Sequence, residues 1–132
     1  MRAVDTNVLA RFYLRDDGKQ TLAADRLFAE GNLFVPKTVL LELEWVLRSV
    51  AEQPATQVMK CLTHLASFPG ITLEDAATVD IALDYWQHGL DFADALHLAS
   101  SRTCDEFLTF DDRGFAARAA RFRAHPPVTI AR

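Results

Sequence analysis

The sequence predicts an α/β protein, a three-layer α/β/α sandwich built on a parallel sheet of four or five strands. Short apolar runs of three or four residues alternate with longer stretches whose apolar residues recur at helical spacing. Glycines, prolines and paired acids separate these segments. Because strands that alternate with helices are joined by crossover connections, they pair in parallel and carry helices on both faces of the sheet.

In the first half of the chain, this punctuation delimits three strands and four helices. The strands are short apolar runs, expected over residues 2–4, 33–35 and 71–73. Helices are expected over 7–14, around 22–28 with a stop at Gly31, from 37 to about 51, and from Pro54 to the break at Pro69.

In the second half, the same signals predict three helices and two strands. A helix follows Glu74 and Asp75 and ends at Gly89, and a second covers 92–104 with Asp91 as its N-cap. A strand over 107–110 precedes a helix that Asp111 and Asp112 cap. The last strand is expected over 128–130, after a proline pair typical of a sheet edge.

Length and composition indicate one domain spanning residues 1–132, since this length buries roughly two-thirds of the surface of the unfolded chain. No apolar run approaches the ~18 residues of a membrane span, and no leader peptide is evident, so we expect no membrane association and a cytoplasmic location. Cys61 and Cys104 are too few for a disulfide framework, and both are expected to be buried, reduced thiols.

The net charge of −4 argues against a simple basic clamp for nucleic acid, but the charge is unevenly distributed. Residues 1–112 contain 9 basic and 18 acidic side chains, a balance of −9, whereas residues 113–132 contain five arginines and no acid, a balance of +5. This tail is either a solvated arginine-rich helix or a contact surface for phosphate or an acidic partner.

Two acids stand directly after predicted strands. Asp5 follows the first strand and Asp111 follows the fourth. In a parallel sheet both lie at the carboxyl edge of the strands, where open α/β sheets bind ligands.

Two further acids lie on predicted helices. Glu42 and Glu44 flank the apolar face of one helix from opposite margins, and Arg48, four residues after Glu44, makes Glu44 the better candidate for a solvated ion pair. Asp94 lies three residues after the N-cap Asp91, where an acid can simply close a capping box, but it also shares a polar stripe with a histidine and a serine.

Clustered carboxylates at Asp5, Glu42, Asp94 and Asp111 favour a divalent cation. Two carboxylates about 4 Å apart repel by roughly 4 kcal/mol at an effective dielectric near 20, and a cation removes that conflict. With oxygen ligands only, Mg²⁺ or Mn²⁺ is the expected ion. Such a site suits phosphodiester hydrolysis.

The same residues fall in four ordered motifs that resemble those of PIN-domain nucleases, and within that family the chain looks most like a VapC-type toxin of a toxin–antitoxin pair. The motifs occupy residues 4–9, 39–49, 91–99 and 108–112. The family's acidic quartet carries over to Asp5, Glu42, Asp94 and Asp111. Glu42 is matched because the family's acid precedes the tryptophan, here Trp45, by three residues.

The resemblance implies a Mg²⁺- or Mn²⁺-dependent endoribonuclease that hydrolyses structured RNA such as tRNA or ribosomal RNA. It also implies a homodimer and a small antitoxin protein that covers the site. Polar residues that resemble groups orienting the carboxylates are Thr6, Asn7 and Thr109, and extra acids close to the site are Asp91 and Asp112.

Two alternatives stay open. A metal-dependent phosphatase with Asp5 as nucleophile would need a second aspartate two residues on, where Asn7 stands. A non-catalytic domain that binds RNA or a protein partner would use the acids only as helix caps, and it predicts that Asp5→Asn and Asp94→Asn leave growth inhibition intact.

Overall fold

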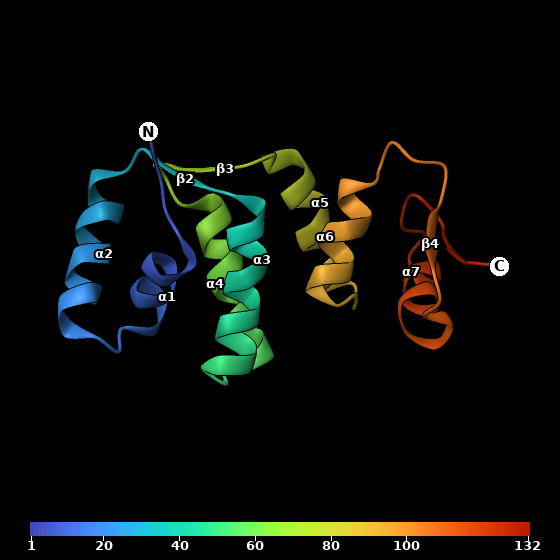
Figure 1. Ribbon diagram of the computed structural model, residues 1–132, viewed down its shortest axis with the longest axis horizontal. Helices are drawn as coiled ribbons and strands as arrows, with labels where there is room; N and C mark the ends of the chain where they lie inside the picture. The colour runs from blue at the N-terminus through green and yellow to red at the C-terminus, as the bar shows by residue number, and fades with distance from the viewer. The chain divides into compact units, whose positions relative to one another are not determined.

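The computed structural model describes residues 1–132, and the chain forms two compact units, Met1–Ala76 and Ala77–Arg132 (Figure 1). Each unit is described by itself. The predicted α/β class is confirmed, because each unit combines helices with a parallel sheet and the five expected strands are all present. Three strands form the sheet of the first unit and two form the sheet of the second.

The sheet of the first unit has the order β1-β2-β3, with both strand pairs parallel. Its strands are β1 (Arg2–Ala3), β2 (Leu33–Val35) and β3 (Ile71–Leu73). Arg2 pairs with Leu33, and Leu33 pairs in turn with Ile71. The backbone amide of Val4 still donates to Phe34 at 3.1 Å, so the ladder reaches the residue before Asp5.

The helices of the first unit follow the predicted order. They are α1 (Thr6–Leu14), α2 (Gly18–Glu30), α3 (Lys37–Trp45), the π-helical turn η1 (Val46–Val50) and α4 (Ala55–Ser67). The helix expected from 37 to about 51 has the predicted extent but changes its hydrogen bonding at Val46, whose carbonyl accepts from Ala51 five residues on. Figure 1 shows α3 and α4 lying side by side, in agreement with their contacts.

The core of the first unit is built mainly from leucines on β2 and on the facing sides of α1, α3 and α4. Each side chain of this size contributes roughly 1.5–3 kcal/mol when fully buried. The leucines with 2 % exposure or less are Leu9, Leu33, Leu40, Leu43, Leu47, Leu62 and Leu65. This packing fixes α1 against α3, and both helices carry candidate site residues.

The second unit combines a two-stranded parallel sheet with two longer helices and two short ones. Its elements are α5 (Ala76–Gln87), α6 (Phe92–Ser100), β4 (Phe107–Thr109), η2 (Asp112–Ala116), α7 (Ala117–Arg121) and β5 (Val128–Ile130). Phe107 pairs with Val128, and Thr109 pairs with Ile130. The apolar face of α6 is buried within the chain, because Phe92, Leu98 and Ala99 are 1 % exposed or less.

One helix end differs from the prediction. The helix expected over 92–104 ends at Ser100, because the amide of Ser101 turns to the carbonyl of Leu98 and the Ser101 hydroxyl donates to the carbonyl of His97. Cys104 therefore lies in the following turn and is exposed, so its expected burial is wrong. Cys61 on α4 is buried as predicted. None of the helices has the length and apolar character that crossing a membrane requires.

Candidate active site

Asp5 occupies the junction between β1 and α1. Its backbone is extended, and its carboxylate accepts a hydrogen bond from the amide of Val8 at 3.3 Å, which makes it the N-cap of α1. The side chain is exposed. Asp5 therefore has a structural role in ending the strand and starting the helix, and it still presents carboxylate oxygen to solvent.

Glu42 lies on α3 and is connected to the same turn through Thr6. The hydroxyl of Thr6, which is 5 % exposed, donates to Oε1 of Glu42. Because Thr6 directly follows Asp5 in the chain, this contact holds two of the four predicted acids in one neighbourhood of the first unit. Thr6 therefore makes a direct contact with one of the predicted acids.

Glu42 and Glu44 differ in their exposure and in their partners. Glu42 is exposed, whereas Glu44 is 4 % exposed and its carboxylate receives the Arg48 guanidinium at 2.7 Å. The predicted ion pair is present, but the expectation that Glu44 is the solvated residue is wrong. Since the Glu44 carboxylate is buried and paired with Arg48, Glu42 is the acid of this helix that is open to a ligand.

Asp94 lies in the first turn of α6 and is partly buried. Burial raises the pKa of its carboxyl group, and the negative charges of Asp91 and then Asp111 raise the pKa further, against the opposing effects of His97 and Arg118. Asp91, Asp94 and Asp111 are therefore close enough to interact electrostatically within the second unit. Asp91 occupies the N-cap position, but its side chain makes no capping hydrogen bond, so the capping-box interpretation does not account for these acids.

Asp111 repeats the arrangement of Asp5. It follows β4, and its carboxylate accepts from the amide of Gly114 at 2.9 Å, which makes it the N-cap of η2. The hydroxyl of Thr109 accepts a hydrogen bond from the backbone amide of Asp111 at 3.0 Å, so Thr109 contacts the main chain of Asp111 and not its carboxylate. Asp112 is the first residue of η2 and is exposed.

Gly114 is a site residue that the sequence reasoning missed. A Cβ atom at this position would lie 2.6 Å from Oδ2 and 2.7 Å from Oδ1 of Asp111, closer than such atoms approach without displacement. The glycine therefore leaves room for the Asp111 carboxylate against the backbone of η2. The sequence carries one signal for this role, because Gly114 lies three residues after Asp111, which directly follows a predicted strand.

Asn7 lines a small pocket between α1 and α2, and none of the four candidate carboxylates lines this pocket. The pocket measures about 210 Å³ and is lined mainly by apolar side chains together with Asn7, Arg11 and Gln20. Asn7 is exposed and makes no hydrogen bond to Asp5 or Glu42.

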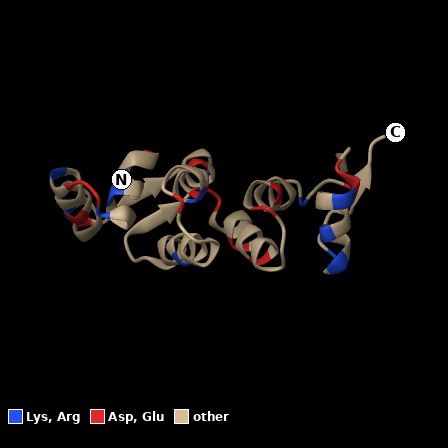
Figure 2. Ribbon diagram, turned by 90° about the horizontal axis from the view of Figure 1, so that it is seen from below, with Lys and Arg blue, Asp and Glu red and all other residues tan.

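The basic residues differ in how far their charge is compensated. Arg11 pairs with Asp16 at 2.5 Å and Arg15 with Asp25 at 2.8 Å, so both charges on α1 are locally matched. In the second unit, arginines gather along η2 and α7, as the blue segments next to the C-terminus show (Figure 2). Arg118 is near enough to Asp94 to lower its pKa.

The carboxylates fall into two groups when each unit is considered alone. Neither unit by itself brings together three or more side chains of the types that bind metal ions. The first unit presents Asp5 and Glu42, and the second presents Asp94 and Asp111 with Asp91 nearby. The donors are all carboxylate oxygens, which is the set that Mg²⁺ and Mn²⁺ prefer.

Comparison with protein families matches residues 2–121 to the PIN domain. None of the curated proteins matches the chain. The matched range includes all four carboxylates, Thr6, Thr109 and Gly114.

Proposed function

This chain belongs to the PIN domain family, and from that membership we propose that it is a metal-dependent endoribonuclease that hydrolyses phosphodiester bonds in structured RNA. PIN domains are generally metal-dependent nucleases, and the family match covers almost the whole chain. The observation that carries the proposal is the Thr6–Glu42 hydrogen bond, which positions Glu42 beside the turn that holds Asp5.

Under this proposal, the ligands of Mg²⁺ or Mn²⁺ are the four acids of the ordered motifs, Asp5, Glu42, Asp94 and Asp111. The residues present fit such an ion in two respects. All of the donors are carboxylate oxygens, and the raised pKa of Asp94 shows a carboxylate whose charge is opposed by burial and by neighbouring acids, a conflict that a cation relieves. When bound, the ion would make water a stronger nucleophile and offset negative charge on the phosphate.

The protein's own residues supply orientation. Thr6 holds the Glu42 carboxylate by a hydrogen bond, and the capping contacts at Val8 and Gly114 fix the carboxylates of Asp5 and Asp111 against their helices. Preset ligands lose little conformational freedom when they bind, which is how a rigid scaffold raises affinity and rate. Arginines on η2 and α7 would favour the approach of the RNA backbone.

Metal dependence is tested by cleavage of total tRNA and ribosomal RNA. We expect EDTA to abolish cleavage and either Mg²⁺ or Mn²⁺, added in excess, to restore it. Cleavage that persists in EDTA after extensive dialysis, and in the Asp94→Asn variant, would refute the proposal.

A non-catalytic role is the second candidate, and the capping contacts of Asp5 and Asp111 favour it because they give both acids a purely structural use. Asparagine caps a helix about as well as aspartate does, but it lacks the charge. If the acids serve only as caps, Asp5→Asn should be silent. If they bind metal, Asp5→Asn should keep the wild-type stability and lose RNA cleavage.

The proposal extends to a biological role as a VapC-type toxin that works as a homodimer and is inhibited by a small antitoxin protein. The ordered motifs that hold the four acids support this role, and it predicts growth arrest when the chain is expressed alone. Co-expression of a short open reading frame from directly upstream should relieve the arrest, and light scattering of the purified protein should give twice the chain mass. Normal growth on expression of a soluble, RNA-cleaving protein would refute the toxin role.

A further inference from the structure

A second pocket in the first unit lies between the C-terminal end of α1 and the middle of α4. It measures about 380 Å³, within the range of small-ligand pockets. One wall is aromatic, with Phe12 and Tyr13 from α1 and His64 from α4. The other lining residues are Arg15, Gln57, Lys60 and Cys61, and none of the lining residues is acidic.

The aromatic wall packs against further aromatic rings. Phe12 stacks on Phe28 with the ring centroids 3.7 Å apart and the planes within 1° of parallel, and Phe28 meets Phe68 edge to face at 5.2 Å. Tyr13 stands perpendicular to His64, with the ring centroids 5.7 Å apart. The His64 ring is exposed and lines the pocket.

Tyr13 and His64 also contribute polar groups to the pocket. The Tyr13 hydroxyl lies 2.9 Å from Nδ1 of His64. Burial raises the pKa of Tyr13, so its phenol stays protonated and can take part in this hydrogen bond.

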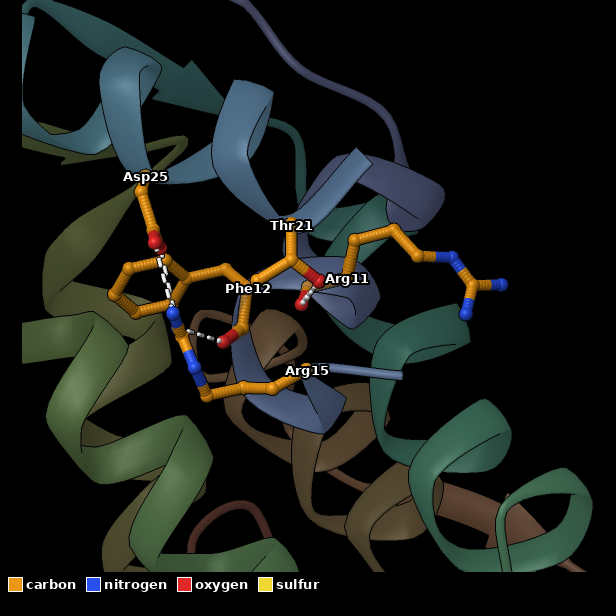
Figure 3. Close-up of polar contacts among 5 residues, drawn as sticks. All are labelled: Arg11, Phe12, Arg15, Thr21 and Asp25. Carbon is orange, nitrogen blue, oxygen red and sulfur yellow. Dashed lines mark hydrogen bonds and ion pairs between the residues drawn. The ribbon is translucent and has the colours of Figure 1, made fainter. Parts of the chain in front are cut away.

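The remaining polar groups are also donors or neutral. Lys60 is exposed and has no ion-pair partner, so its ammonium group is available to an anion. Gln57 offers an amide, and burial raises the pKa of Cys61 so that its thiol stays neutral. Arg15 forms the rim but is committed to Asp25 and to the carbonyl of Phe12, as Figure 3 shows.

The position of the pocket relates it to the candidate active site. Thr6, which contacts Glu42, and Tyr13 are seven residues apart on α1, so they lie on the same side of the helix two turns from one another. At 1.5 Å per residue this separation is about 10 Å along the helix axis. A nucleic-acid strand that passes the Asp5–Glu42 end can therefore reach the pocket within a few nucleotides.

We propose that this pocket is a nucleotide subsite, in which one base of the RNA substrate stacks against His64 and the adjacent phosphate binds Lys60. The inference rests on the proposed function for its substrate, and it adds a binding site away from the acidic residues. Single-stranded RNA is commonly bound by bases stacked on aromatic rings beside cations that follow the phosphates. This pocket has aromatic rings on one wall, a lysine beside them and no carboxylate among its lining residues, so it fits a base together with its phosphate.

Binding of a short fluorescein-labelled single-stranded RNA to the full chain in EDTA tests the subsite without cleavage. We expect Lys60→Ala to weaken binding and to reduce the slope of log affinity against log salt by about 0.7, the contribution of one phosphate contact to a single strand. We expect His64→Ala to weaken binding about fivefold or more, the range seen for loss of one stacked base. Lys19→Ala removes an exposed lysine from α2, outside the pocket, and should leave both the affinity and the slope unchanged.

A crosslinking experiment locates the contact directly. RNA carrying 4-thiouridine should crosslink, after irradiation, to peptides that contain Tyr13 or His64, and the yield should fall in His64→Ala. Equal RNA affinity in the wild type, Lys60→Ala and His64→Ala would overturn the subsite and leave the pocket to a protein segment. Cleavage of RNA by the wild type with Mn²⁺ is measured in parallel, so that loss of the subsite is distinguished from failure of the nuclease proposal.

Discussion

Thr6 donates its hydroxyl hydrogen bond to the carboxylate of Glu42, and this contact links the turn after β1 to the middle of α3. Thr6→Val keeps the shape of the side chain and removes the donor. We expect RNA cleavage to fall about tenfold or more, as is common when a group that orients a metal ligand is lost. Because Glu42 is exposed and can bind water instead, the free energy of unfolding should change by no more than about 1.5 kcal/mol.

Thr6→Ser keeps a hydroxyl and is the matched control, with kcat/KM and urea unfolding measured for both variants. Equal cleavage by Thr6→Val and the wild type would contradict the assignment.

Gly114 gives the Asp111 carboxylate its space. In Gly114→Ala the new methyl group would occupy the position of the Asp111 oxygens, so the carboxylate has to rotate away and loses its bond to the Gly114 amide. We expect a loss of stability of about 1 kcal/mol, the usual value of an N-cap contact, together with a tenfold or larger loss of cleavage. Gly18→Ala is a suitable control, because no atom lies within 4 Å of a Cβ there. Activity in Gly114→Ala equal to that of Gly18→Ala would show that Asp111 does not need this position.

Asp94 should lower the stability of the metal-free protein at neutral pH. Its pKa is raised by burial and then by Asp91, so the folded state binds a proton there more tightly than the unfolded state does. The charged carboxylate therefore lowers the free energy of unfolding at any pH above the raised pKa of the folded state. This destabilisation disappears as the pH falls from that pKa to the ordinary pKa of an aspartate in the unfolded chain. We expect Asp94→Asn to raise Tm at pH 7 in EDTA, and the gain to vanish toward pH 3. A variant with lower Tm than the wild type at pH 7 would contradict this assignment.

Substitution of Arg48 should destabilise the protein more than substitution of its ion-pair partner Glu44. Arg48→Ala leaves the buried Glu44 carboxylate without its partner and should cost about 1–3 kcal/mol, the usual penalty for stranding a buried polar group. Glu44→Gln keeps a hydrogen-bond acceptor facing Arg48, whose side chain is about half exposed, so we expect a smaller loss. Because neither side chain is a proposed ligand, we expect neither change to reduce kcat for RNA cleavage by more than about threefold, or about 0.7 kcal/mol. Loss of cleavage in Glu44→Gln with normal cleavage in Glu42→Gln would reverse our choice of ligand.

Local signals in the sequence accounted for most of the secondary structure. Asp5 and Asp111 accept hydrogen bonds at the starts of α1 and η2, and Gly31 ends α2 with a φ of +70°, because capping and chain reversal depend on a few neighbouring residues. Parallel pairing also followed from the alternation of strands and helices. The early end of α6 was missed, because the Ser101 hydroxyl competes with the helical backbone only once that turn is formed.

The sequence predicts which residues form the candidate site, but it does not predict their burial or their hydrogen-bond partners. From the sequence we could predict which carboxylates follow strands, that their oxygens suit Mg²⁺ or Mn²⁺, and that the motifs resemble those of the PIN domain. Three features required the packed chain: Glu44 is buried and paired with Arg48, Glu42 contacts Thr6, and Gly114 makes room for Asp111. A helical wheel gives the direction of a side chain around one helix, but burial and hydrogen bonding depend on which other element packs against that direction.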